Sequence, residues 1–146
     1  MTPQSRWGLT PRQSIERECG DRGRPAVIDG CVRLILGKQT DPDLLMALGG
    51  PGAAKFLDGG QHVDTYWLRV WGARGLLWAW DDSALAAIRA ALDDDAWRVR
   101  EMAVKVVARH LLGDALSKAA ELRDDPVPRV RTAAARAVAV LTEAGA

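Results

Sequence analysis

The residue types that carry most catalytic and metal chemistry are scarce in this chain of 146 residues. It contains two histidines, two cysteines, one tyrosine and one phenylalanine. Cys19 and Cys31 form no CxxC pair, and the spacing of the cysteines and histidines matches no zinc motif. P-loop, GxGxxG and GxSxG signatures are also missing. The sequence therefore favours a protein that is not an enzyme, and it predicts neither a cofactor nor a metal.

Long apolar runs are missing as well. No stretch approaches the roughly 18 apolar residues of a membrane span, and the first twenty residues lack the basic-then-apolar layout of a secretory signal. The low cysteine content suits a reducing compartment, so we predict a cytoplasmic protein without membrane contact. Hydrophobic residues make up 48% of the chain and charged residues 27%, a balance typical of a folded domain and not of a disordered segment.

What the chain does have is a repeat with a period of 31 residues. The dipeptides Leu68-Arg69, Val99-Arg100 and Val130-Arg131 define it. The same interval separates small, aliphatic and basic residues, namely Gly72, Ala103 and Ala134; Leu76, Val107 and Val138; and Arg74, Lys105 and Arg136. A period in this range with helical patterning is typical of stacked helical hairpins.

The helices expected in this part follow from the same pattern. We predict helices over residues 66–80, 83–92, 97–111, 114–123 and 128–142. The turns between them are rich in aspartate, including the run of residues 93–95. Carboxylates there can accept hydrogen bonds from the free N–H groups of a helix start, so we interpret them as caps and not as a metal or general-base cluster.

The first half of the chain does not obey the repeat. Thr10-Pro11 followed by Gln13 predicts a helix start with a capping box. Pro25 and Asp41-Pro42 indicate two further helix starts. We predict a single domain over residues 1–146, with a flexible tail at 1–9, an N-terminal helical cap at 10–60 and repeats at 61–146.

Two segments carry a resemblance to a known family. DDDAWRVREMAVKVVARHL (93–111) and DDPVPRVRTAAARAVAVL (124–141) resemble the second helices of HEAT repeats, especially the short repeats of phycobilin lyase-type proteins. The resemblance covers about residues 51–142 and weakens in the tryptophan-rich helix 66–80, before which the turn aspartates are reduced to Asp64. It implies an all-α fold, an α-solenoid of about three HEAT-like helical hairpins behind the N-terminal cap.

One set of basic residues is predicted to hold the stack together. On a helical wheel of about 100° per residue, Arg100 falls at the edge of the apolar stripe of helix 97–111. Its register equivalents are Arg69 and Arg131. A guanidinium at that edge can bind a turn carboxylate of a neighbouring hairpin, and the candidates for this structural role are Asp94, Asp95 and Asp125.

A second set forms the candidate binding surface. Carried through the register, the face opposite the apolar stripe contains Trp67, Arg74, Trp78, Arg98, Lys105, Arg109, Arg129 and Arg136. Residues 97–110 and 128–141 each have a net charge of +3, whereas 81–95 and 112–125 have −4 and −2. The HEAT-like resemblance implies that the second helices line the concave face. We therefore expect a basic inner surface and an acidic outer one.

Several interpretations of this basic surface stay open. It is either an ordinary solvated face, or a site for an acidic protein segment, or a site for nucleic acid. Trp67 and Trp78 either belong to it or lie under the N-terminal cap. His110, in register with Leu141, is predicted to be a core residue, and His62 has no catalytic partner nearby in sequence.

Among these, we favour a small adaptor that binds an acidic protein or peptide on the concave face. The alternative is a nucleic-acid-binding protein, because some DNA glycosylases are built from HEAT-like repeats. A weaker alternative is a lyase-type HEAT subunit, which the repeat type alone suggests. The oligomeric state and the identity of the partner cannot be predicted from the sequence.

Overall fold

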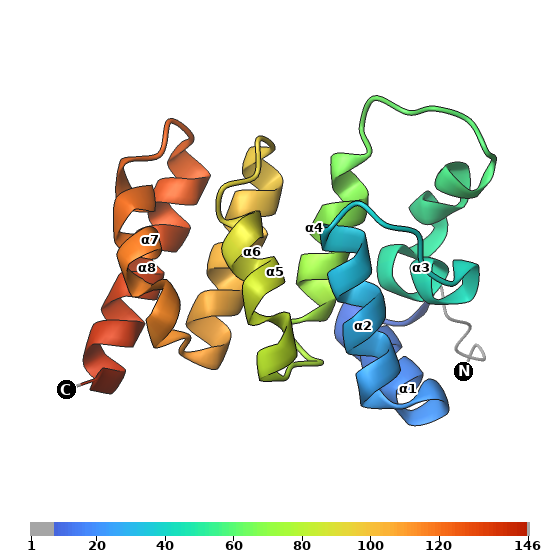
Figure 1. The fold of residues 1–146 in the computed structure, drawn as a ribbon, viewed down its shortest axis with the longest axis horizontal. Coiled ribbons are helices and arrows are strands. Elements are labelled where there is room, and N and C mark those ends of the chain that lie inside the picture. Colours follow the sequence, from blue (N-terminus) through green and yellow to red (C-terminus); the bar gives the residue numbers. More distant parts are fainter. Residues whose placement is uncertain (1–7, 146) are drawn as a thin grey trace.

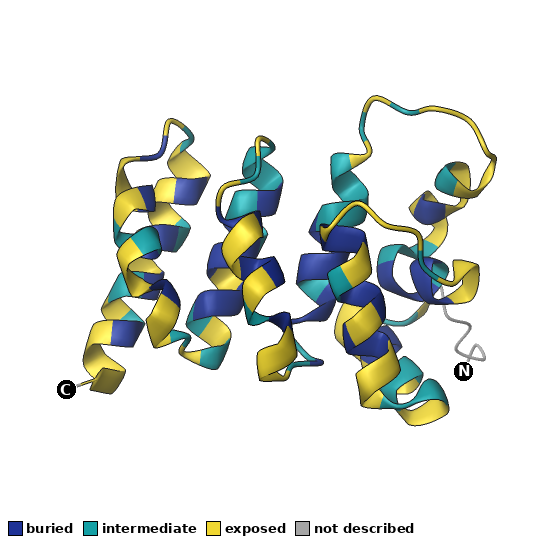
Figure 2. Ribbon diagram, in the orientation of Figure 1, coloured by how far each residue is buried: buried dark blue, intermediate teal, exposed yellow. Residues whose placement is uncertain are grey.

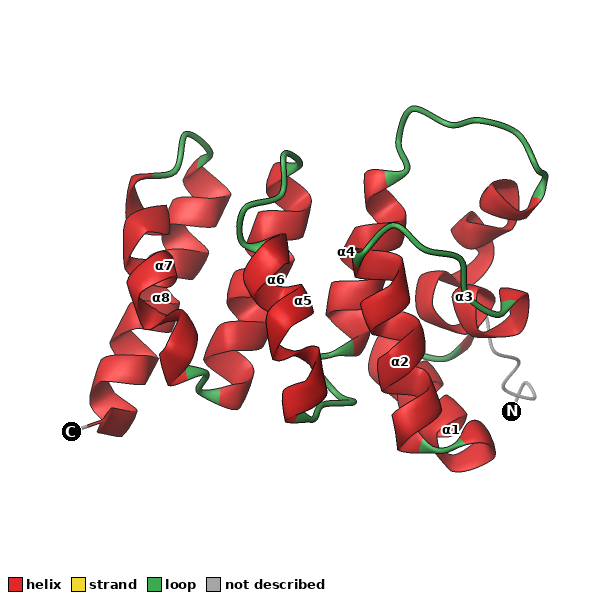
Figure 3. Cartoon of the chain, in the orientation of Figure 1, coloured by secondary structure: helices red, strands yellow, loops and turns green. Residues whose placement is uncertain are grey.

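The computed structural model describes residues 8–145, and within this range all regular structure is helical and none is strand (Figure 3). This confirms the predicted all-α class. The elements are α1 (Pro11–Arg22), α2 (Arg24–Ile35), α3 (Pro42–Gly49), the 3₁₀ segment η2 (Gly50–Leu57), α4 (Tyr66–Gly75), η3 (Asp82–Ala84), α5 (Leu85–Ala91), α6 (Trp97–His110), η4 (Gly113–Ala115), α7 (Leu116–Glu121), η5 (Leu122–Asp124) and α8 (Pro128–Gly145). Most of the predicted tail, residues 1–7, lies outside the described residues.

The helix starts in the first half follow from capping chemistry. Gln13 N donates to Thr10 Oγ1 at 3.2 Å, and Thr10 N donates to Gln13 Oε1 at 3.0 Å, so the predicted capping box is confirmed. Leu44 N donates to Asp41 Oδ1 at 3.1 Å at the start of α3. The backbone hydrogen bond to Leu44 is the main reason why the pKa of Asp41 is lowered.

The long helices pack in sequence order. α4 lies between α2 and α6, and α6 lies between α4 and α8. The shorter α5 and α7 pack against α6 and α8. Figure 1 shows the three N-terminal helices at one end of the molecule and the α7–α8 pair at the other. No helix of residues 8–145 combines the length and the apolar character needed to cross a bilayer.

One continuous core runs through this row of helices (Figure 2). Val99, Val106 and Val107 of α6 are fully buried, and Trp71 is buried in α4. Gly72 lets α4 approach α2, because a Cβ added there would lie 2.7 Å from the carbonyl oxygen of Cys31. Cys31 is itself in the core, and its burial raises the pKa of its thiol to about 12.

Some predicted helix ends are wrong. The helix predicted over 66–80 ends at Gly75, where Leu76 N turns to the carbonyl of Ala73 and tightens the last turn. The helices predicted at 83 and 114 begin later, because a short 3₁₀ turn precedes each of them. α6 ends at His110, one residue before the predicted end, because the φ of Leu111 is left-handed at 53°, and α8 continues beyond the predicted residue 142.

Candidate functional site

Two arginine–aspartate bridges join successive hairpins. Arg69 binds the carboxylate of Asp94 through Nε at 2.7 Å and Nη2 at 3.1 Å. Arg100 binds Asp125 in the same way, at 2.8 and 3.1 Å. Both pairs are separated by 25 residues, so one geometry recurs one period further along the chain. Such two-point contacts fix the orientation of the two groups as well as their distance.

Each of these aspartates also organises its own turn. Asp94 accepts from Ala96 N at 2.8 Å, and Asp125 accepts from Val127 N at 2.9 Å. Burial of Asp125 opposes its ionisation, but the hydrogen bonds from Arg100 and Val127 N outweigh this, and the pKa of Asp125 is lowered. Asp95 differs from the prediction, since only its backbone carbonyl contacts Arg100, at 3.1 Å.

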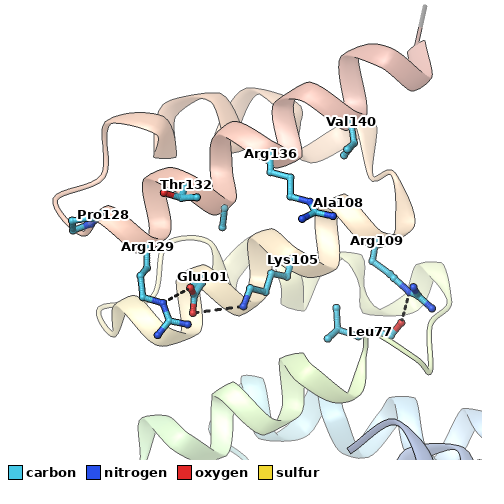
Figure 4. Close-up of a pocket in the computed structure, with 11 residues that line it drawn as sticks. Leu77, Glu101, Lys105, Ala108, Arg109, Pro128, Arg129, Thr132, Arg136 and Val140 are labelled. Atoms are coloured by element: carbon cyan, nitrogen blue, oxygen red, sulfur yellow. Dashed lines mark hydrogen bonds and ion pairs between the residues drawn. The ribbon is translucent and has the colours of Figure 1, made fainter.

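A cavity of about 730 Å³ lies between α6 and α8 (Figure 4). We call it the α6–α8 cavity. Its lining residues are Leu77, Glu101, Lys105, Ala108, Arg109, Pro128, Arg129, Thr132, Ala133, Arg136 and Val140. Four members of the predicted basic surface therefore come together here: Lys105, Arg109, Arg129 and Arg136. Aliphatic side chains form much of the remaining wall.

A buried carboxylate lies beside two of these four cations. Glu101 is 8% exposed, and its Oε2 accepts from Arg129 Nε at 2.9 Å. Lys105 Nζ lies 3.9 Å from Oε1 of the same group. Glu101 is not among the site residues predicted from the sequence. The i, i+4 spacing of Glu101 and Lys105 was the available signal for their pairing.

The other two cations have no carboxylate partner among the described residues. Arg109 Nε donates to the carbonyl of Leu77 at 3.2 Å, which directs this side chain from α6 toward the segment that follows α4 (Figure 4). Arg136 points from α8 toward the cavity and is exposed. With four cations and one carboxylate, the lining has a net charge of +3.

Of the two aromatic members of the predicted surface, Trp67 and Trp78, Trp67 contacts an arginine. The guanidinium carbon of Arg98 lies 4.4 Å from the ring centre of Trp97 and 5.4 Å from that of Trp67. Arg129 lies 5.4 Å from Trp97 as well. Arg98 is half-buried in this cluster and does not line the α6–α8 cavity. The Arg98–Trp67 and Arg129–Trp97 contacts are cation–π contacts between neighbouring long helices, whereas the Arg98–Trp97 contact lies within α6.

Arg74 departs from the predicted surface. It is half-buried, and its Nη2 donates to the carbonyl of Leu48 at 2.6 Å, so it ties α4 to the end of α3. Burial lowers its pKa, and its Nε is buried without a hydrogen-bond partner among the described residues. Trp78 is half-buried and does not line the cavity either. Arg74 was assigned by its register with Lys105, but α3 has no counterpart in the later hairpins.

The histidines have structural surroundings. His110 Nε2 lies 2.7 Å from the carbonyl of Leu76, so this nitrogen carries a hydrogen, and the ring stacks on Trp80 at 4.9 Å. Burial is the main reason why the pKa of His110 is lowered. His62 Nε2 lies 3.1 Å from Asp58 in the loop before α4. Neither histidine lines the α6–α8 cavity.

Comparison of the chain with protein-family models, with curated proteins and with solved structures gave no match. No relative therefore lends an activity to the cavity, and its function has to be inferred from its geometry and charge.

Proposed function

We propose that this chain is a small, non-enzymatic adaptor that binds an acidic segment of a partner protein in the α6–α8 cavity. We further propose that its fold is an α-solenoid of HEAT-like hairpins, with residues 10–60 as a cap. The ordered packing of α2, α4, α6 and α8 supports this, as do the two equivalent bridges at Arg69 and Arg100.

The observation that carries the proposal is the composition of the cavity wall. Lys105, Arg109, Arg129 and Arg136 surround it, while Glu101 supplies the only carboxylate of the lining. Glu101 partly neutralises the charges of Arg129 and Lys105. Arg109 and Arg136 have no carboxylate partner among the described residues, so they are the cations best placed to bind an incoming anion. Arg109 uses Nε for Leu77 and keeps its two Nη groups, and arginines suit carboxylates, which they can bind at two points.

The apolar part of the wall distinguishes this site from a plain solvated face. Leu77, Ala108 and Val140 lie beside the cations. A segment that alternates acidic and aliphatic residues would bury apolar area at about 25 cal/mol per Å² while its carboxylates pair with the arginines. Such a segment contacts both the cations and the aliphatic side chains of the wall, whereas a small anion would contact only the cations.

Nucleic acid is the second candidate, and one feature weighs against it. Arg98 already covers Trp67 and Trp97, so these ring faces are not open for stacking with bases. The lyase-type hypothesis rests on the resemblance alone and stays the weakest of the three.

Fluorescence anisotropy can test the proposal. A short labelled peptide of glutamates with two leucines and a labelled DNA duplex are titrated with the protein at about 50 and 200 mM salt. We expect the peptide to bind and the double variant Arg109→Gln, Arg136→Gln to lose at least about tenfold in affinity, equivalent to about 1.4 kcal/mol.

Arg89→Gln is the matched control, because Arg89 is an exposed arginine on α5, away from the cavity. It should leave the affinity unchanged. Equal losses in the control and the double variant, or tighter binding of DNA than of the peptide, would contradict the proposal.

A further inference from the structure

The guanidinium of Arg100 makes hydrogen bonds on two sides. Its Nη1 donates to the carbonyls of Asp94 and Asp95, at 2.8 and 3.1 Å, in the turn before its own helix. Its Nε and Nη2 face the other way and bind Asp125 in the next hairpin. The first contact holds the guanidinium in place, and the second joins two hairpins.

Arg131 repeats the first half of this arrangement. Its Nη1 donates to the carbonyls of Asp125 and Pro126, at 2.8 and 3.1 Å, so the distances match those of Arg100. Within residues 8–145, no carboxylate lies against its Nε and Nη2, and the side chain is exposed. An arginine fixed in this way has already lost much of its rotamer freedom, so binding a carboxylate costs less entropy.

The surface around Arg131 is exposed, whereas the corresponding surface one period earlier, around Arg100, is buried. Val104 on α6 is fully buried, whereas Ala135, one period later on α8, is exposed. Leu92 is fully buried, whereas its equivalent Arg123 is exposed. Figure 1 shows α7 and α8 at one end of the row of helices. The outer face thus keeps the bridging arginine but replaces large apolar residues with small or polar ones, which suits a partner that can leave again.

We propose that the outer face of the α7–α8 pair docks a helical hairpin of another protein, one that presents an aspartate in the turn between its helices. The aspartate would take the place that Asp125 has for Arg100. A second copy of this chain, stacked in the same register, offers Val63 where Asp94 and Asp125 stand, and its neighbouring Asp64 is paired with Lys55, so it supplies no free carboxylate at that position. The inference does not depend on the α6–α8 cavity.

The face can be tested with a chain that is lengthened by a copy of its own last helical pair. A copy of residues 111–141 is joined directly after Leu141, which places the copied Asp125 25 residues after Arg131, the spacing of both existing bridges. We expect one cooperative thermal transition with a midpoint above that of the native chain. Arg131→Gln should lower this midpoint by about 3 °C more in the extended chain than in the native one.

A double-mutant cycle separates the bridge from general packing. Arg131→Gln and an aspartate-to-asparagine change in the added copy should each lose stability, and together they should lose less than the sum. The Arg100–Asp125 pair serves as the internal reference. The NMR signal of Arg131 Nε–H should also become protected from exchange, which reports the bridge even if a variant unfolds.

Three results would overturn the proposal. The first is an added unit that melts separately from the rest of the chain. The second is additivity of the two substitutions together with an unprotected Arg131 signal. The third is a dimer of the native chain in sedimentation equilibrium that Arg131→Gln abolishes, because it would assign the face to a second copy.

Discussion

Arg129 on α8 donates to the buried carboxylate of Glu101 on α6 across 2.9 Å, and this pair lies at the edge of the basic cavity. The contact joins two hairpins, and it also reduces the positive charge that a ligand meets. Glu101 therefore competes with any incoming carboxylate for Arg129 and Lys105.

Replacing Glu101 with glutamine should strengthen acidic ligands. Glu101→Gln removes one negative charge and leaves Arg129 and Lys105 without their carboxylate. We expect the affinity for the glutamate-leucine peptide to rise severalfold, while unfolding in urea shows a loss of about 1 kcal/mol or less, because Arg129 is largely exposed. Weaker peptide binding by a folded Glu101→Gln variant would exclude this role.

Removing Arg100 should destabilise the fold without changing ligand binding. The carboxylate of Asp125 is buried, so Arg100→Gln leaves a buried charge without its main partner at a cost of about 3 kcal/mol. Arg69→Gln should cost less, since Arg69 and Asp94 are more exposed. Urea unfolding measures both effects, and a smaller loss for Arg100→Gln than for Arg69→Gln would show that burial does not set the strength of these bridges.

Asp125 predicts a loss of stability in acid. Its pKa is lowered in the folded chain, so its contribution is fully present above the ordinary aspartate pKa and is lost as the pH falls through the folded value. Urea unfolding from pH 5 downward should show this decline. The decline should be smaller in Arg100→Gln, because the partner that stabilises the charged form is gone, and an unchanged slope would contradict the assignment.

His110 predicts a second pH dependence at a higher range. Burial lowers its pKa, so the unfolded chain binds the proton more readily, and stability should fall as the pH drops below the ordinary histidine pKa of about 6.5. His110→Leu places there the residue found at Leu141, one period later. Thermal unfolding between pH 7.5 and pH 5.5 should lose this slope in His110→Leu, and a retained slope would point to another group.

Gly72 predicts a steric requirement between α2 and α4. Gly72→Ala places a Cβ 2.7 Å from the carbonyl oxygen of Cys31, and we expect a net loss of about 1–3 kcal/mol despite better helix propensity. Gly20→Ala in α1 is the control, since nothing lies within 4 Å of the added Cβ, and it should gain about 0.5–1 kcal/mol. Equal effects of both changes in urea unfolding would refute the close approach of α2 and α4.

The repeat in the sequence was enough to predict the helical class and to nominate the arginines and aspartates that form the bridges. Arg100 and Asp125 could be matched because the period of 31 residues places them in register with Arg69 and Asp94. The same logic failed for Arg74. Its surroundings come from α3, which lies outside the repeat, and the carbonyl of Leu48 holds its guanidinium there.

The cavity was harder to predict, for a physical reason. Its wall depends on how far α8 is displaced from α6 and on which rotamers Arg109 and Arg129 adopt. Neither is encoded in a helical wheel. Glu101 illustrates this, because its hydrogen bond comes from Arg129 on another helix, and no single-helix pattern contains that contact.

The most direct test of the proposed function is an NMR titration of the ¹⁵N-labelled chain with the unlabelled glutamate-leucine peptide. We predict saturable shifts of the backbone amides of Ala108, Thr132 and Ala133, which line the α6–α8 cavity, and loss of these shifts in the Arg109→Gln, Arg136→Gln variant. Shifts confined to α5 and α7, or no saturable shift at the peptide concentration that saturates anisotropy, would contradict binding in this cavity.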